Sequence, residues 1–120
     1  MDVKKRKPYN FCIFQGEDVK FSTVYKDSDG AVIDITGYTA RLQARTSYED
    51  DSDPAPVALS SSPGVVIAGA EGKVTFFITN AQTSGLTPGE YVYDAELIDG
   101  SGLVTKLLFG KIEVLPEVTK

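Results

Sequence analysis

The sequence predicts an all-β fold, an immunoglobulin-like antiparallel β-sandwich of about seven or eight strands. Strand-like runs arrive about every 10 to 15 residues with Gly, Pro or Asp clusters between them, which is the spacing of a sandwich or barrel. No segment reads as a crossover helix, so the sheets are expected to be antiparallel. At 120 residues the chain makes one domain, in which two sheets must stack to bury their apolar faces.

The first half of the chain alternates strands with Gly-containing turns. The strands are expected at residues 9–14 (YNFCIF), 17–26 (EDVKFSTVYK, with Val19, Phe21, Thr23 and Tyr25 inward) and 31–35 (AVIDI). Asp27 to Gly30 (DSDG) is a predicted turn, because Asp side chains cap nearby amides and Gly adopts positive φ without strain. Thr36-Gly37 turns the chain again.

Residues 38–46 (YTARLQART) show the cleanest alternation in the sequence. One side carries Tyr38, Ala40, Leu42 and Ala44, and the other carries Thr39, Arg41, Gln43 and Arg45. A period of two residues marks an antiparallel strand whose polar face is solvated or free to meet a partner.

The second half is predicted to hold an exposed acidic loop and five strands. The loop covers residues 47–56, and the strands cover 57–60, 64–69, 73–79, 90–99 and 103–115, with a bend or bulge at Gly110. Residues 80–86 read as one helical turn capped by Asn80. The expected core includes Tyr38, Leu42, Phe76, Ile78, Tyr91, Tyr93 and Leu97.

The composition excludes the common catalytic constellations. The chain has no histidine, which removes Ser-His-Asp and Cys-His arrangements and most zinc sites. Its single cysteine, Cys12, lies between Phe11 and Ile13, so we expect a small buried apolar side chain that forms no disulfide. No phosphate-binding glycine loop occurs. We therefore expect neither an enzyme nor a cofactor.

Two acidic clusters resemble cation sites at first sight. The first is DSDG at residues 27–30, and the second comprises Glu49, Asp50, Asp51 and Asp53. The first lacks the glutamate that closes an EF-hand loop and lies between strands. We interpret both as solvated turns and predict no metal, with calcium as the alternative.

The N-terminus is basic although the whole chain is acidic. A net charge of −5 argues against nucleic acid as the main partner. Lys4, Lys5, Arg6 and Lys7 precede Pro8, so residues 1–8 are predicted to form a basic arm and residues 9–120 the sandwich domain. The arm is either a solubilising tail or a segment that docks on an acidic partner surface. The chain has neither a long apolar run nor a signal-peptide pattern, so no membrane association is expected.

Several apolar residues are expected on outward strand positions. Phe77 lies opposite Phe76 on its strand, and Phe109 lies opposite Leu108. They are either scattered surface residues or a patch that a partner covers. The candidate partner-binding residues are therefore Lys4, Lys5, Arg6, Lys7, Phe77 and Phe109.

Three segments carry a resemblance to a known family. They are the first strand with Gln15-Gly16, the segment from Asp27 to Ala40, and the ending at residues 88–97, 107–114 and 116–119. Together they resemble small structural proteins of tailed-bacteriophage virions and the N-terminal domain of phage baseplate upper proteins. The resemblance implies an immunoglobulin-like, non-enzymatic virion module that docks on other virion proteins.

The resemblance implies a location in the virion after assembly in the host cytoplasm. We expect a head decoration protein that packs on the major capsid protein, with a tail, baseplate or tail-fibre attachment module as the alternative. Self-association into a homo-oligomer is left open. An alternative of another class is an immunoglobulin-like carbohydrate-binding module, which needs Tyr9, Tyr48 and Phe77 to form an aromatic platform on one face.

Overall fold

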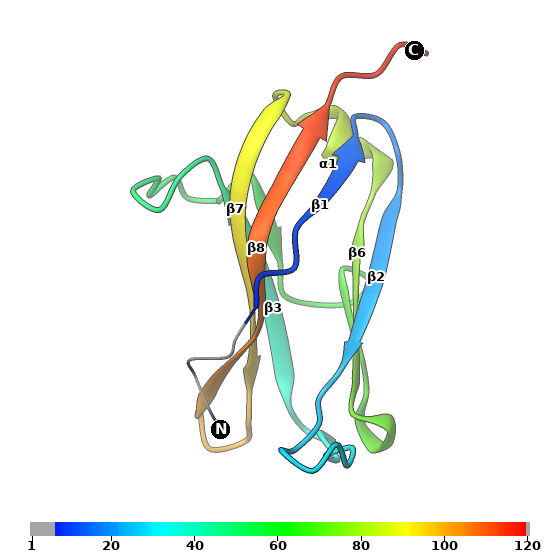
Figure 1. Ribbon diagram of the computed structural model, residues 1–120, viewed down its shortest axis with the longest axis vertical. Helices are drawn as coiled ribbons and strands as arrows, with labels where there is room; N and C mark the ends of the chain where they lie inside the picture. Colours follow the sequence, from blue (N-terminus) through cyan, green and yellow to red (C-terminus); the bar gives the residue numbers. More distant parts are fainter. Residues whose placement is uncertain (1–6, 120) are drawn as a thin grey trace.

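The computed structural model describes residues 7–119 and folds them into two stacked sheets (Figure 1). The strands are β1 (Phe11–Phe14), β2 (Val19–Val24), β3 (Thr39–Arg45), β4 (Val57–Leu59), β5 (Val65–Ala68), β6 (Lys73–Ile78), β7 (Gly89–Ile98) and β8 (Val104–Leu115). The large sheet has the order β1-β8-β7-β3-β4, and the small sheet has the order β2-β6-β5. The predicted all-β sandwich is thus confirmed.

The division of strands between the sheets is that of an immunoglobulin-like fold. The last hairpin, β7-β8, lies beside β3 and β4, while β2, β6 and β5 form the opposing sheet. Immunoglobulin domains divide their strands in the same way, with G, F, C and C′ on one sheet and B, E and D on the other. The predicted fold class therefore holds at the level of strand order as well as strand number.

One pairing departs from the expected antiparallel arrangement. β1 runs parallel to β8, with Phe11 opposite Ile112 and Phe14 opposite Leu115. After β1 the chain crosses at once to the small sheet as β2, and it returns to the large sheet only later. The rest of the domain thus connects the two paired strands, so their parallel pairing requires no crossover helix. The expectation of purely antiparallel sheets is wrong here.

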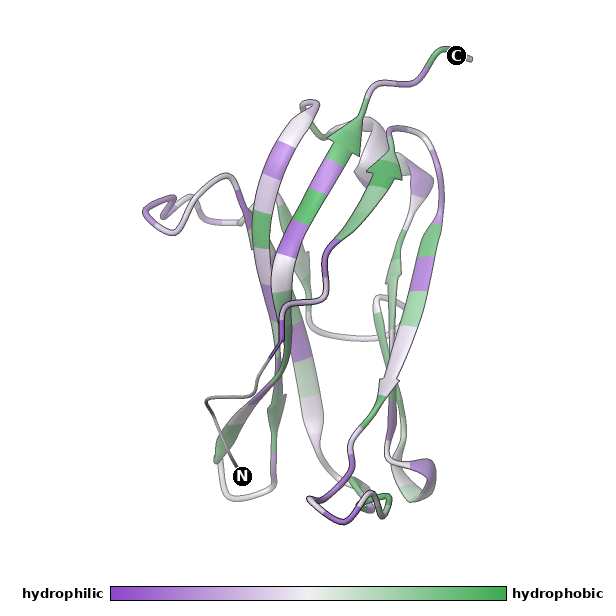
Figure 2. Cartoon of the chain, in the orientation of Figure 1, coloured by the Kyte–Doolittle hydropathy of each residue, from purple (hydrophilic) through white to green (hydrophobic). Residues whose placement is uncertain are grey.

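The core consists of the inward residues of both sheets. Six of the seven predicted core residues are buried: Leu42, Phe76, Ile78, Tyr91, Tyr93 and Leu97. Tyr38 is only half-buried, because it lies in the turn just before β3 and packs on the core from its margin. Apolar and polar residues alternate along the strands that frame this core (Figure 2).

Cys12 is exposed, which corrects the expectation of a buried thiol. It alternates with the inward residues Phe11 and Ile13, and Ile13 is buried against the core. Two consecutive strand residues cannot both face the core, because side chains on a strand alternate between its two faces. The apolar neighbours of Cys12 in the sequence therefore place it on the outer face.

Aromatic side chains link the two sheets where antibody domains carry a disulfide. The Tyr91 hydroxyl at the start of β7 donates a 2.8 Å hydrogen bond to the carbonyl oxygen of Thr87, which is the tyrosine corner of immunoglobulin-like folds. Two residues later, Tyr93 occupies the position of the second antibody cysteine and contacts Phe11, with ring centroids 5.5 Å apart. Phe11 packs on Phe21 of the small sheet at 5.1 Å. These contacts hold the sheets together without a disulfide.

One predicted strand is absent from the connections. Residues 31–35 make only an isolated bridge, between Lys26 and Val32, rather than a strand. The predicted DSDG turn is confirmed, with the Asp27 carboxylate accepting hydrogen bonds from the amides of Asp29 (2.9 Å) and Ala31 (3.0 Å). After the turn, the Ile33 amide donates to the Tyr25 carbonyl oxygen (3.0 Å) and the Ile35 amide to that of Gly69 (2.9 Å), so the segment bonds to two different parts of the chain and forms no continuous ladder.

The predicted helical turn is present as α1 (Asn80–Ser84), but its cap is Thr79 and not Asn80. Thr79 and Gln82 form a reciprocal capping box, which satisfies two backbone amides at the helix start. The buried Thr83 hydroxyl donates to the carbonyl oxygen of Glu17 at 2.8 Å and so ties α1 to the β1–β2 turn. Within residues 7–119 no helix is long and apolar enough to cross a membrane.

The irregularity in β8 lies at Leu107 and not at the predicted Gly110. Ala95 pairs with Leu108 but the next residue, Glu96, pairs with Lys106, which leaves Leu107 as the extra residue of a bulge. Gly110 is required for another reason, because the segment before β1 crosses directly over it. A Cβ at Gly110 would lie 2.4 Å from the Tyr9 carbonyl oxygen, so no larger residue fits.

Candidate interaction surface

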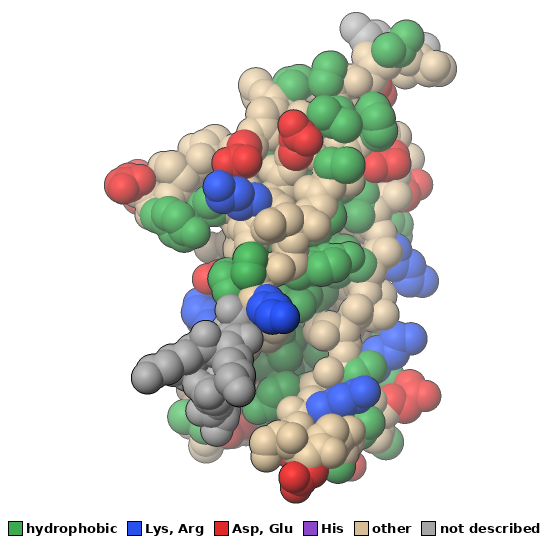
Figure 3. All heavy atoms as spheres, viewed as in Figure 1, with side chains coloured by type: hydrophobic (Ala, Val, Ile, Leu, Met, Phe, Trp, Pro, Cys, Tyr) green, Lys and Arg blue, Asp and Glu red, His purple; other side chains and the backbone are tan. Residues whose placement is uncertain are grey.

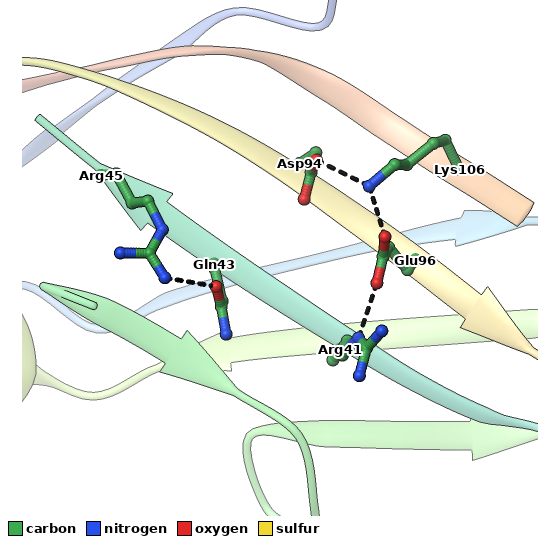
Figure 4. Close-up of polar contacts among 6 residues, drawn as sticks. All are labelled: Arg41, Gln43, Arg45, Asp94, Glu96 and Lys106. Carbon is green, nitrogen blue, oxygen red and sulfur yellow. Dashed lines mark hydrogen bonds and ion pairs between the residues drawn. The ribbon is translucent and has the colours of Figure 1, made fainter. Parts of the chain in front are cut away.

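The outer face of the large sheet carries a network of paired charges (Figure 4). Arg41, Glu96 and Lys106 lie opposite one another on β3, β7 and β8. Arg41 Nε donates to Glu96 Oε1 at 2.6 Å, and Lys106 Nζ donates both to Asp94 Oδ2 at 2.9 Å and to Glu96 Oε2. The network joins three neighbouring strands, and the positive charges of Arg41 and Lys106 balance the negative charges of Asp94 and Glu96.

The network shifts the pKa values of two of its members, Glu96 and Lys106. The hydrogen bond from Lys106, aided by Arg41, holds the pKa of Glu96 below its ordinary value despite partial burial. Partial burial acts to lower the pKa of Lys106, but the bonds to Glu96 and Asp94 together outweigh it and raise that pKa. Glu96 and Lys106 are therefore both ionised at neutral pH. Such compensated charges suit a binding surface better than acid–base catalysis, which needs a group that changes protonation near neutral pH.

The loop at residues 46–53 lies beside this face, and the Arg45 side chain bonds to its backbone. Arg45 Nη1 donates to the carbonyl oxygens of Asp50 (3.1 Å) and Ser52 (2.8 Å), and Nη2 donates to Gln43 Oε1 (3.0 Å). Within the loop, the Asp50 carboxylate accepts from the amides of Ser52 (3.0 Å) and Thr46 (3.1 Å). These hydrogen bonds, led by that from Ser52, hold the pKa of Asp50 well below its usual range. The loop thus has a defined shape and projects sideways from the sheet in Figure 1.

A hollow of about 500 Å³ lies between the loop and the sheet. Its lining includes Arg41, Gln43, Arg45, Tyr48, Val92, Asp94, Glu96, Lys106 and Phe109. Tyr48 on the loop is 85% exposed, and the space-filling view shows the notch beneath the loop (Figure 3). Arg41 uses only Nε toward Glu96, and its two terminal nitrogens bond no other group of the described chain. The hollow therefore offers an aromatic ring and free planar donors to a ligand.

The structure separates the residues predicted to bind a partner. Lys4, Lys5 and Arg6 lie outside the described residues, whereas Lys7 is exposed. Phe77 is half-buried on the outer face of the small sheet, between the buried residues Phe76 and Ile78. Phe109 is half-buried on the large sheet, opposite the outward residue Asp94. The two phenylalanines thus face opposite sides and do not form one apolar patch.

The aromatic platform expected for a carbohydrate-binding module is not formed. Tyr9 packs on Phe11 and Phe21, with ring centroids 5.5 and 6.4 Å away, at the open edge between the sheets. Tyr48 stands over the large sheet, and Phe77 lies on the outer face of the small sheet. Three aromatic rings on different sides of the domain cannot stack on one sugar chain.

Neither acidic cluster gathers its side chains around a common point. Among residues 7–119 no group of three Asp, Glu or Cys side chains is arranged to hold a metal ion. In both clusters a carboxylate is bonded to backbone amides instead, Asp27 to Asp29 and Ala31, and Asp50 to Thr46 and Ser52.

The hollow and its charge network have no clear signal in the sequence. Arg41 and Glu96 are 55 residues apart, and nothing local in the sequence indicates that they pair. The alternation in residues 38–46 was nevertheless a partial signal, because it placed Arg41, Gln43 and Arg45 on one outward face.

Comparisons with known proteins give no assignment for this surface. No protein-family model matches the chain, and no curated protein sequence is detectably similar to it. Among solved structures, extracellular domains 3–5 of Drosophila OTK align with 94% of the chain at 16% sequence identity and a TM-score of 0.41. The chain spans about a third of the length of that structure, 34% of it. A likeness this distant says nothing about partners or activity.

Proposed function

We propose that this chain is a non-enzymatic structural protein of a tailed-bacteriophage virion, where it decorates the head by packing on the major capsid protein. The virion part of the proposal depends on the resemblance of residues 14–45 and 86–119 to small virion proteins. The immunoglobulin-like sandwich is compatible with it, because this fold is used widely as a docking module. The alternative within the same class is attachment to tail or baseplate proteins.

The observation that carries the docking role is the hollow beneath the loop at residues 46–53. Arg and Tyr are enriched in protein–protein interfaces, and both Arg41 and Tyr48 present free polar and aromatic surface there. The charges beneath them are paired with one another, so a partner need not compensate them when it excludes water. This arrangement favours a polar but specific protein contact.

Virion location is tested by mass spectrometry of separated heads and tails. A decoration protein is expected in the head fraction, in proportion to the major capsid protein. Recovery with tails would instead support the tail or baseplate alternative. Absence from purified particles of every kind would refute the virion proposal.

The docking surface is tested by adding purified protein to particles that lack it. Tyr48→Ala and Arg41→Ala should each weaken attachment roughly tenfold or more if they are central contacts. Phe77→Ala on the opposite sheet is the matched control. Phe109→Ala tests whether the partner also contacts the border of the hollow. If Phe77→Ala alone weakens attachment, the domain docks through its small sheet.

The predicted basic arm requires its own experiment. Deletion of residues 2–7 should weaken attachment at low salt and make it less salt-dependent, since attraction between exposed charges is screened over about 8 Å at physiological salt. Unchanged attachment would assign Lys4, Lys5, Arg6 and Lys7 to a solubilising tail.

Carbohydrate binding is the second candidate function, and one observation favours it. Tyr48 borders a hollow that also holds Arg41 and Gln43, and sugar sites commonly combine an aromatic ring with planar polar groups. A glycan array distinguishes the two candidates. Glycan binding that Tyr48→Ala abolishes would favour the carbohydrate-binding module. If no glycan on the array binds, this candidate function is excluded.

A further inference from the structure

We propose that the free edge of β8 is a second docking site, which accepts an acidic, extended segment of a partner protein as an added strand. The site lies at the open side of the sandwich between β8 and β2. It shares Lys106 and Phe109 with the hollow beneath the loop at residues 46–53, but it opens along the edge of β8 toward β2. The proposal does not depend on whether the partner belongs to a virion.

The first observation is the missing neighbour of β8. β1 pairs only with the last part of β8, from Ile112 to Leu115. Before β1, the Tyr9 amide donates a 2.8 Å hydrogen bond to the Phe109 carbonyl oxygen, and the contact of the described chain with this edge ends there. From Val104 to Leu108 the described chain therefore supplies no strand on this side of β8. An unpaired edge is a template for an extended segment.

The second observation is a hollow of about 330 Å³ along this edge. β8 contributes Thr105, Lys106, Leu107 and Phe109, and the chain at the end of β2 contributes Val24, Tyr25 and Lys26. Val24 is 39% exposed and Val104 at the start of β8 is 46% exposed, so apolar surface lies within reach of an added strand. Alternate side chains of that strand can contact this surface while its backbone pairs with β8.

The third observation fixes the charge of the occupant. The hollow is lined by three lysines, Lys7, Lys26 and Lys106, and by no acidic residue. Lys106 is neutralised by Asp94 and Glu96, whereas Lys26 makes no ion pair within residues 7–119. The chain as a whole carries a net charge of −5, so this basic edge is a local exception. It attracts carboxylates and repels basic segments.

The same features protect the edge from indiscriminate pairing. Lysines and bulges on edge strands discourage unspecific strand addition. Here Lys106 and the bulge at Leu107 both fall within the free stretch. An apolar segment would leave Lys26 without an opposite charge beside it, whereas an acidic segment pairs with it. The edge is thus selective for acidic occupants.

The test uses a fluorescein-labelled peptide of alternating Glu and Val, with a peptide of alternating Lys and Val as the charge control. We expect the full-length protein to bind the acidic peptide and not the basic one. Lys26→Glu should weaken this binding roughly threefold to tenfold, because it replaces an attraction by a repulsion. Lys20→Glu is the matched control, since Lys20 is an exposed lysine of β2 that does not line the hollow.

Hydrogen exchange separates strand addition from simple charge attraction. The bound acidic peptide should slow amide exchange within Val104–Leu108 relative to the free protein. Absence of binding, equal losses from Lys20→Glu and Lys26→Glu, or binding without slower exchange would each overturn the proposal. Self-association of the protein that Lys26→Glu abolishes would also overturn it, by making a second copy the occupant.

Discussion

The Tyr93 hydroxyl donates a 2.6 Å hydrogen bond to the carbonyl oxygen of Tyr9, a residue 84 positions earlier in the chain. Burial raises the pKa of Tyr93, so its hydroxyl stays protonated and remains a donor. Together with the Tyr9 amide bond to Phe109, this contact fixes the segment before β1 across the middle of the β7–β8 hairpin. The path of the described chain just before β1 is therefore set from within the core.

We expect Tyr93→Phe to lower the free energy of unfolding by about 1 kcal/mol, the usual contribution of one such hydrogen bond. It should also speed amide exchange at Tyr9. Denaturant unfolding and hydrogen exchange measure the two effects. Tyr38→Phe is the control, because Tyr38 is half-buried and its hydroxyl makes no hydrogen bond within residues 7–119. Equal effects of the two variants would mean that the bond to Tyr9 contributes nothing.

Two neighbouring phenylalanines on β6 should differ sharply in their contribution to stability. Phe76 is fully buried and contacts Phe21, with ring centroids 5.5 Å apart, so Phe76→Ala should cost about 3–5 kcal/mol. Phe77→Ala on the outer face should cost much less. Chemical denaturation of both variants measures the difference. Similar losses would mean that the small sheet packs differently from the structure.

The charge network on the large sheet should make stability depend on acid pH. The pKa of Glu96 is lowered by folding from its ordinary value of 4.5. The stabilisation is therefore fully present above about pH 4.5 and is lost as the pH falls through the folded-state pKa. Between about pH 6 and about pH 3, the melting temperature of Glu96→Gln should fall less than that of the original protein.

Glu113→Gln is the control for this pH dependence, since Glu113 is exposed on the same sheet and makes no ion pair in the described chain. Its melting curve should follow that of the original protein at every pH. If Glu96→Gln does the same, the network contributes nothing measurable to stability.

Divalent cations should leave the melting temperature unchanged. The carboxylates of Asp27 and Asp50 already accept hydrogen bonds from backbone amides, and these bonds occupy oxygens that a cation would need. Calorimetry with added chelator and with millimolar calcium checks this. A ligand that binds only the folded state must stabilise it, so a rise of several degrees with calcium would reveal a cation site.

The fold could be predicted from the sequence because strand patterning is local. The alternation of Ala40, Leu42 and Ala44 with polar residues requires a strand with one buried face, and the structure buries all three. The same alternation places Cys12 on the exposed face, although its apolar neighbours in the sequence suggested that it would be buried. The two residues beside a given strand residue face the opposite side of the sheet from it. An apolar run by itself therefore does not show which of its residues are buried.

Periodicity and turn chemistry over a few residues are enough to predict the two-sheet sandwich, the turn at Asp27–Gly30 and most of the core. Tertiary packing instead sets the parallel pairing of β1 with β8, the hollow beside Arg41 and the separation of Phe77 from Phe109. Each of these joins or separates residues far apart in the chain. Their relative positions depend on how the sheets pair and stack, and no local pattern records that.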